Sequence, residues 1–201
     1  MSAFFAREGR TWETLKRVCD ALRSERIDHA LYGGMASALH GFSRYTDTVE
    51  ILTTGQGLGR IHARLVGCGY VPANAGARRT FRDIQTGGLV MIVTAGEYPG
   101  NRKPKPITFP DPRSAAVKCE GYDVLRVRVL IELKLAAGLW TPNNLRDLAD
   151  VQDLILALEL ARDLGEQLDT SVRHEYYRIW DVAQTPDHFG QGVKPRSPQS
   201  A

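Results

Sequence analysis

The residues with the clearest chemical potential lie between positions 31 and 53 of this chain. Gly33 and Gly34 stand between a short apolar stretch and a run that predicts a helix. Glycine lets a backbone approach a ligand closely, and the N–H groups at a helix start attract anions, so the pair predicts an anion-binding turn. Thr48 and Glu50 follow on the next predicted strand, where alternate positions share one face. Glu50 is the acidic member of that pair.

Two basic residues are further candidates for the same site. Arg44 lies in the loop before the strand that carries Glu50. Lys134 lies in the otherwise apolar segment VLIELKLAAG, so its charge needs an explanation. It could keep its ammonium group at the edge of the core, bind a phosphate, or pair with Asp147 or Asp150. For the two aspartates we favour an intrahelical ion-pair set with Arg146.

The elements that must position these residues are predicted from periodicity and from turn residues. Residues 12–26 have the apolar spacing of a helix, for which Thr11 is the predicted N-cap. Thr86, Gly87 and Gly88 predict a hairpin turn. The other predicted strands and helices occupy residues 30–32, 35–40, 48–53, 58–67, 70–71, 79–85, 89–94, 114–119, 123–127, 129–138, 143–160 and 168–182. Residues 55–59 are predicted to be a flexible lead into a helix, and residues 103–112, rich in proline, an extended arm anchored by Ile107 and Phe109.

This order of elements predicts an α/β or α+β fold with a small mixed sheet flanked by helices. We expect an α/β core over residues 1–128 and a helical region over 129–183 packed on it. Residues 184–201 are rich in Pro, Gly, Ser and Gln and are predicted to be disordered.

Composition excludes some classes of protein. A content of 43% hydrophobic and 24% charged residues is ordinary for a globular domain. No apolar run approaches the ~20 residues that a membrane span requires, and the first ten residues lack the pattern of a signal peptide. The three cysteines, Cys19, Cys68 and Cys119, have no metal-ligand or disulfide spacing. We therefore expect a cytoplasmic protein without a membrane partner.

Positive charge gathers in the middle third of the chain, although the net charge is only +3. The residues concerned are Arg78, Arg79, Arg82, Arg102, Lys103, Lys105, Arg113 and Lys118. They could form a solvated surface or a contact for a phosphate-rich ligand such as RNA. Nothing in the sequence points specifically to DNA.

In their order and spacing, several short motifs resemble the DNA polymerase β-like nucleotidyltransferase superfamily, in the branch of small bacterial proteins that includes nucleotidyltransferase toxins. The resemblance covers residues 27–156. The residues that carry it are Gly33–Gly34, Ala36, His40–Gly41, Arg44, Thr46, Thr48–Glu50, the segments 95–106 and 132–136, and RDLADV at 146–151.

The resemblance implies two acids on one strand and a third on a neighbouring strand, together holding two Mg²⁺ ions. It also implies a glycine pair that cradles the triphosphate of an NTP and a lysine that contacts phosphate. Carried over to this chain, the three acid positions fall on Thr48, Glu50 and Met91. Only Glu50 is a carboxylate, and the Met91 thioether is too soft a donor for Mg²⁺. The metal-binding motif is therefore degenerate.

Asp83 is a possible substitute for the missing acids. If the hairpin is centred on Gly87, Asp83 lies opposite Met91 and shares its face. A change of one residue in the register would turn it away. We predict that Asp83 does not complete the site.

These observations lead to one favoured function and two alternatives. We expect a nucleotidyltransferase-fold protein that is catalytically impaired and retains binding of an NTP or phosphate through Gly33, Gly34, Arg44 and Lys134. The first alternative is an active enzyme with Glu50 and Lys134 as catalytic residues, which uses Mg²⁺ and an NTP to modify a hydroxyl of a protein, an RNA or a small molecule. The second is an RNA-binding module that uses the basic middle third.

Overall fold

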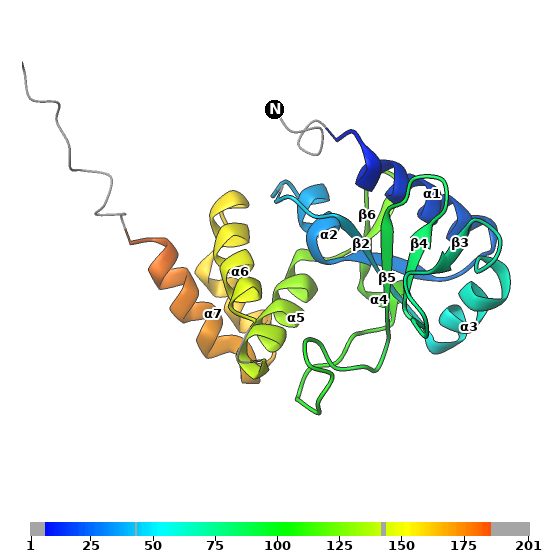
Figure 1. Ribbon diagram of the computed structural model, residues 1–201. Helices are drawn as coiled ribbons and strands as arrows, with labels where there is room; N and C mark the ends of the chain where they lie inside the picture. The colour runs from blue at the N-terminus through cyan, green and yellow to red at the C-terminus, as the bar shows by residue number, and fades with distance from the viewer. Residues whose placement is uncertain (1–6, 43, 142–143, 186–201) are drawn as a thin grey trace, which may run out of the picture.

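The computed structural model of the chain describes residues 7–42, 44–141 and 144–185. Within them a 7-stranded mixed sheet has the order β3-β4-β5-β2-β1-β7-β6 (Figure 1). The pairs β2–β5 and β1–β7 are parallel, and the other neighbours are antiparallel. The strands are β1 (His29–Tyr32), β2 (Thr48–Thr53), β3 (Tyr70–Pro72), β4 (Thr80–Asp83), β5 (Leu89–Thr94), β6 (Ala116–Cys119) and β7 (Tyr122–Leu125). The predicted mixed sheet is confirmed.

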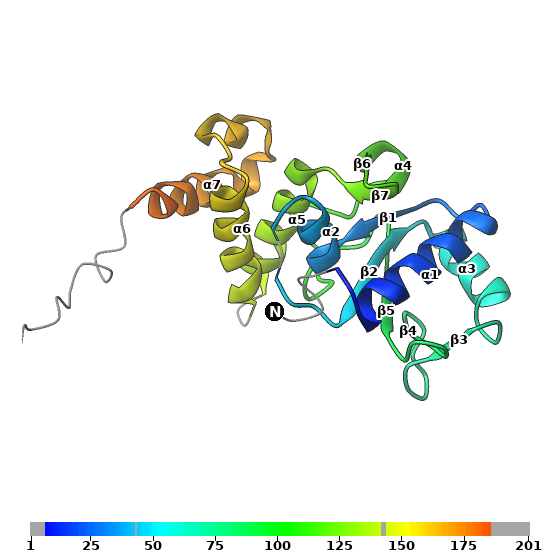
Figure 2. The same ribbon diagram turned by 90° about the horizontal axis from the view of Figure 1, so that it is seen from above.

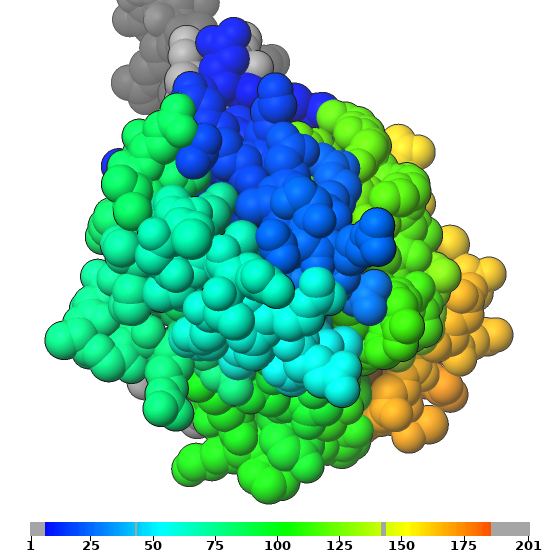
Figure 3. All heavy atoms as spheres, turned by 90° about the vertical axis from the view of Figure 1, so that its right-hand side faces the viewer, coloured from blue at the N-terminus to red at the C-terminus, as the bar shows by residue number. Residues whose placement is uncertain are grey.

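Helices cover both faces of the sheet. Their bounds are α1 (Arg10–Ser24), α2 (Gly33–Leu39), α3 (Gly55–Arg64), α4 (Pro112–Ala115), α5 (Val127–Trp140), α6 (Leu145–Ala157) and α7 (Thr170–Ala183), with a 3-10 helix η1 (Arg162–Gln167). In Figures 1 and 2, α1 and α3 lie on one side of the sheet, and α5, α6 and α7 on the other. Figure 3 views the molecule from the first of these sides, where α1 and α3 cover the strands.

The middle of the sheet is apolar because it is buried between these layers. All four residues of β1 are buried, and Leu31, Ile51 and Ile92 are at most 1% exposed. Strands that are covered on both faces need such continuous apolar runs. A polar residue such as Glu50 in β2 therefore marks a place where the covering layers leave room.

At two helix starts the difference from the sequence prediction changes the role of a residue or segment. Helix α1 begins at Arg10 after Gly9, so Thr11 is inside the helix rather than at its N-cap, and its hydroxyl donates to the carbonyl oxygen of Thr46 at 3.2 Å. Helix α3 begins at Gly55, because the hydroxyl oxygen of Thr54 accepts from the Gly57 N–H at 3.0 Å. The glycine-rich stretch 55–59 is thus part of a capped helix and not a flexible lead.

The helices α5, α6 and α7 share one continuous apolar core with the sheet. That core contains Leu31 of β1, Leu133 of α5 and Tyr176 of α7, all nearly inaccessible. The arm before α4 contributes Ile107 and Phe109, which are 8% and 4% exposed, so the predicted anchors are confirmed. The predicted tail lies outside the described residues from position 186 onward. Across the described ranges, no helix is both long enough and apolar enough to cross a membrane.

Candidate functional site

Glu50 lies at the third position of β2, directly beside the start of α2. Its Oε2 atom accepts a hydrogen bond from the Gly34 N–H at 3.1 Å. Gly33 has φ +64°, and a Cβ atom at Gly33 would lie 1.6 Å from Glu50 Oε2. Gly33 is therefore needed twice, for its left-handed backbone and for the space that the Glu50 carboxylate occupies.

The glycine pair consequently holds a carboxylate of the chain itself. Gly33 and Gly34 form the first two residues of α2 and are buried. A carboxylate at a helix start is favourable because it meets the unpaired N–H groups and the positive end of the helix dipole. A phosphate bound through the Gly34 N–H would first have to displace Glu50.

Lys134, Arg44 and two aspartates form an ionic network behind this carboxylate. The Nζ atom of Lys134 lies 2.7 Å from Asp150 Oδ2 and 3.1 Å from Asp147 Oδ1. Arg44 contacts both Asp150 oxygens, from Nε at 2.8 Å and from Nη2 at 2.9 Å. Asp150 thus joins the loop before β2 to helices α5 and α6. Among the alternatives for Lys134, pairing with Asp147 and Asp150 is observed.

The intrahelical ion-pair set predicted for the aspartates is wrong. Asp147 and Asp150 lie on the face of α6 that meets α5, so they pair with Lys134 rather than with the exposed Arg146. Lys134 is only 3% exposed, and a buried ammonium group requires such partners. Burial by itself would lower the pKa of Lys134, but the two aspartates outweigh it and the pKa is raised.

A pocket of about 170 Å³ opens beside Glu50. Its lining includes Tyr32, Met91, Arg102 and Asp147. Tyr32 packs edge-on against Phe109, with ring centroids 5.1 Å apart. Burial raises the pKa of Glu50, an effect opposed by Lys134 and by the Gly34 N–H and reinforced by Asp147. The pocket therefore places the carboxyl groups of Glu50 and Asp147 beside aromatic rings.

Comparison with solved structures identifies the fold that carries this pocket. The antibiotic-resistance factor ANT(2'')-Ia matches with a TM-score of 0.52 at 12% identity, over 84% of this chain and 94% of that chain. The chain has a nucleotidyltransferase fold. JHP933 from Helicobacter pylori, with a TM-score of 0.47 and 16% identity, covers 85% of this chain and 89% of its own. A proposed nucleotidyltransferase from H. pylori has the same two values and covers 86% and 91%. No family model and no curated protein matches the sequence.

The residues at the positions where the sequence resemblance implies acids do not fit the Mg²⁺ that a nucleotidyltransferase fold implies. Met91 lies directly beside Glu50 in the parallel register of β2 and β5, and Thr48 donates to Asp47 Oδ1 at 3.0 Å. Nowhere in the described part of the chain do three His, Cys, Asp or Glu side chains gather closely enough to hold a metal ion. Mg²⁺ requires near-octahedral oxygen coordination, and a single carboxylate beside a thioether does not supply it.

Asp83 lies elsewhere in the nucleotidyltransferase fold, because the hairpin has neither of the two registers considered for it from the sequence. Thr80, not Asp83, is opposite Met91. Asp83 is fully buried, pairs with Arg17 Nε at 2.7 Å, and accepts from the Gln85 N–H at 2.9 Å. By strand spacing it is roughly 14 Å from Glu50, since it lies two strands across and three residues along. It serves the hairpin turn and the contact with α1.

Sequence reasoning missed two residues of the nucleotidyltransferase-fold pocket. The sequence places Tyr32 only in a strand and Asp147 only in an ion pair, with Arg146 or with Lys134, yet both line the pocket with Glu50. For Asp147 an indication existed, because a lysine inside an apolar helix calls for buried acids nearby. For Tyr32 none existed, because its contact with Phe109 joins segments that are 77 residues apart.

The basic middle third does not form a single surface on this fold. Arg79 and Arg82 lie at or beside β4, near one edge of the sheet, and Lys118 lies on β6, which is the other edge. Several of these charges also have partners. Arg79 pairs with Glu97 at 2.5 Å, and Lys118 pairs with Asp123 at 2.9 Å. The topology therefore places the basic residues on which the RNA-binding alternative depends near opposite edges of the sheet.

Proposed function

We propose that this nucleotidyltransferase-fold protein is catalytically inactive in metal-dependent transfer and acts by binding a nucleotide. One observation carries the proposal: Met91 lies beside Glu50 at the position where the family resemblance implies an acid. Thr48 offers at most a neutral hydroxyl at the other position. At an effective dielectric constant near 20, each missing carboxylate removes about 4 kcal/mol of attraction per unit charge at 4 Å. Even a fraction of that loss weakens Mg²⁺ binding by orders of magnitude.

The remaining carboxylate is also less available than a metal ligand should be. Glu50 already accepts from the Gly34 N–H, and its raised pKa reflects the cost of charging it in this enclosure. The hydrogen bond to the start of α2 and the coordination of a metal ion therefore compete for the Glu50 carboxylate. This supports a structural role for Glu50 at the start of α2 in place of metal binding.

Retained nucleotide binding is supported by the lining of the pocket beside Glu50. Tyr98 offers an aromatic ring for a base, and Arg102 offers a cation for a phosphate. Arg44 and Lys134 contribute less, because Asp150 engages both of them. We expect a nucleotide to bind through its base more than through its phosphates, with an affinity that Mg²⁺ does not increase.

The first experiment measures binding and transfer with the same protein preparation. Isothermal titration with each NTP, with and without Mg²⁺, is followed by an assay for transfer from α-labelled NTP to protein, RNA or small-molecule hydroxyls. We expect nucleotide binding that is independent of Mg²⁺ and no transfer. Transfer that Glu50→Ala abolishes and that depends on Mg²⁺ would overturn the proposal.

One observation favours the active enzyme as a second candidate. Asp147 lines the same pocket as Glu50 and could act as a relocated acid. Its Oδ1 atom, however, is 3.1 Å from Lys134 Nζ, and its Oδ2 atom accepts from Asn144. If this candidate is correct, Asp147→Asn abolishes transfer as completely as Glu50→Ala does, whereas Asp83→Asn leaves it intact in the folded fraction.

A further inference from the structure

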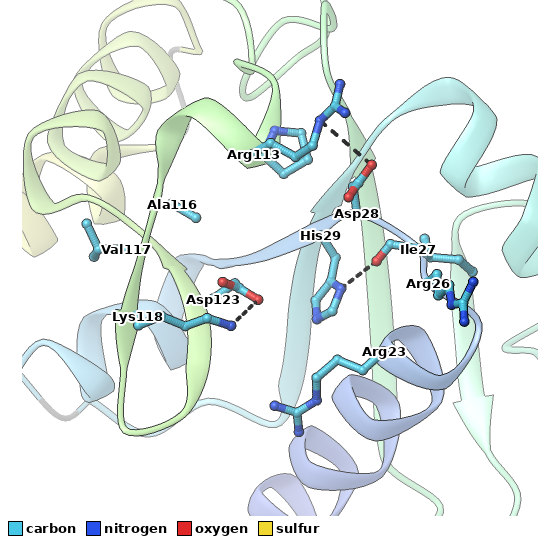
Figure 4. Close-up of a pocket in the computed structure, with 11 residues that line it drawn as sticks. Arg23, Arg26, Ile27, Asp28, His29, Arg113, Ala116, Val117, Lys118 and Asp123 are labelled. Carbon is cyan, nitrogen blue, oxygen red and sulfur yellow. Dashed lines mark hydrogen bonds and ion pairs between the residues drawn. The ribbon is translucent and has the colours of Figure 1, made fainter.

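A second pocket lies at the other end of β1 from Glu50. Tyr32, at the last position of β1, pairs with Glu50, whereas His29, at the first position, pairs with Thr53. His29 lines a pocket of about 460 Å³ between the end of α1, the start of β1, helix α4 and the β6–β7 hairpin (Figure 4). This volume lies within the range of pockets that enclose small organic ligands. We call it the His29 pocket.

Positive charge dominates the His29 pocket. Four cations line it, Arg23, Arg26, Arg113 and Lys118, against two carboxylates, Asp28 and Asp123. The four positive and two negative charges leave a net charge of +2 on the lining. A phosphomonoester carries about −1.5 to −2 at pH 7, so its charge balances that of the pocket.

The four cations of the His29 pocket differ in how closely they contact acidic residues of the chain. Lys118 is 2.9 Å from Asp123, and Arg23 donates to Asp20 and to the carbonyl oxygen of Gly121. Arg113 Nε is 3.5 Å from Asp111 and 3.7 Å from Asp28, which are loose contacts. The guanidinium group of Arg26 has no ion pair or hydrogen bond with any described residue. Arg26 and Arg113 are therefore the cations available to a ligand.

His29 provides the second, independent observation. It is 8% exposed, and its Nδ1 atom lies 2.8 Å from the carbonyl oxygen of Ile27. A carbonyl only accepts hydrogen bonds, so Nδ1 carries the proton and Nε2 of the neutral ring is an acceptor. Nε2 has no hydrogen-bond partner among the described residues, and Figure 4 shows the ring between Arg23 and Asp123 in the pocket. Nε2 is not one of the buried side-chain atoms that lack a partner, so it is reached from the pocket and can accept a hydrogen bond from a ligand or from water.

The charged groups that act on the pKa of His29 come from three elements packed around it. Arg23 of α1 and Lys118 of β6 disfavour a charged imidazole, and Asp123 of β7 favours it. Burial has the largest effect and lowers the pKa of His29. The neutral tautomer inferred from the Ile27 contact is thus consistent with its surroundings.

From this geometry we propose that the His29 pocket binds a phosphorylated sugar, free or as part of a mononucleotide. The phosphate is held by Arg26 and Arg113, whose planar guanidinium groups suit its oxygens. A sugar hydroxyl donates to His29 Nε2. This site is separate from the pocket beside Glu50, and its occupancy does not depend on the function proposed for that pocket.

The test is an NMR and calorimetric titration of the full chain with four probes. Inorganic phosphate, ribose 5-phosphate, AMP and a single-stranded RNA oligomer are added separately at low ionic strength. We expect ribose 5-phosphate and AMP to bind more tightly than inorganic phosphate and to shift the His29 Nε2 resonance. Equal affinities for ribose 5-phosphate and AMP indicate a free sugar phosphate as the ligand, and a tighter AMP complex indicates a mononucleotide.

The matched variants are two double substitutions with the same change in charge. Arg26→Gln with Arg113→Gln should weaken binding at least about tenfold through the loss of charge-assisted hydrogen bonds. Arg10→Gln with Arg146→Gln removes two exposed arginines outside the pocket and should leave the affinity unchanged. The proposal is overturned if the His29 resonance does not move, if both double variants bind alike, or if the RNA oligomer binds far more tightly than either sugar phosphate.

Discussion

At the scale of single residues, Gly33 and Glu50 are complementary residues from two different elements. The left-handed backbone at Gly33 turns the chain from β1 into α2, and the missing side chain leaves room for the Glu50 carboxylate. The sequence motif that resembles a phosphate cradle thus has a structural explanation of its own. That explanation can be tested without any ligand.

Gly33→Ala should lower the free energy of unfolding by at least about 2 kcal/mol. The backbone strain at φ +64° alone accounts for about 1–3 kcal/mol, and the collision with Glu50 Oε2 adds to it. Adding Glu50→Ala removes the collision but not the strain, so the double variant should recover only part of the loss. Urea unfolding followed by far-UV circular dichroism measures all three proteins.

Gly59→Ala is the matched control for this substitution. Gly59 lies within α3, has no positive φ, and has no atom within 4 Å of the position of a Cβ atom. Alanine there should stabilise the protein by about 0.5–1 kcal/mol. If Gly33→Ala were as stable as the natural chain, that result would contradict the close approach of Gly33 to Glu50.

At the scale of elements, the sequence predicted the features that depend on a single strand. It was less informative about features that depend on contacts between two elements. The alternation in β2 and the apolar run in β5 predicted both strands, and Met91 lies beside Glu50 as the resemblance implied. The observed hairpin register matches neither of the two considered for Asp83, because Asp83 closes the turn itself: its side chain accepts from the Gln85 N–H and its carbonyl from the Gly87 N–H. Its burial against Arg17 depends on α1, which the local pattern does not contain.

Asp150 gives the sharpest test of how the elements are joined. Its carboxylate lies between Arg44 of the loop before β2 and Lys134 of α5, and it is 4% exposed. Asp150→Asn leaves the buried Lys134 and the half-buried Arg44 without their shared negative charge and should cost about 3–5 kcal/mol of stability. Asp147→Asn, one turn earlier on α6, should cost less, because Asp147 is 19% exposed and contacts only Lys134 among these cations.

The two asparagine variants form a matched pair, since the same atom changes on the same helix. Equal losses in urea unfolding would mean that Arg44 contributes little to holding Asp150. A loss confined to Asp147→Asn would contradict the arrangement of the network itself. The ion pair between Arg44 and Asp150 argues against a phosphate-binding role for Arg44. Either of these results would make such a role plausible again.

At the scale of the whole molecule, the sequence predicted two regions, with a boundary between residues 128 and 129. That boundary falls inside α5, which begins at Val127, and the apolar core runs without a break from the sheet into α5, α6 and α7. Periodicity identifies helices, but it does not tell whether their apolar faces meet a second core or the same one. The continuity of the core favours one cooperative unit.

Tryptophan fluorescence can test this cooperativity, because the chain carries a probe at each end of the molecule. Trp12 lies in α1, and Trp180 lies in α7, where its Nε1 donates to the carbonyl oxygen of Leu160 at 2.8 Å. Replacing Trp140 and Trp180 with Phe leaves Trp12 as the only probe, and replacing Trp12 and Trp140 leaves Trp180. In each variant the urea midpoint from fluorescence should coincide with the midpoint from far-UV circular dichroism, which serves as the internal control. If Trp180 reported a transition at lower urea than circular dichroism, α7 would unfold before the sheet, and the single cooperative unit would be contradicted.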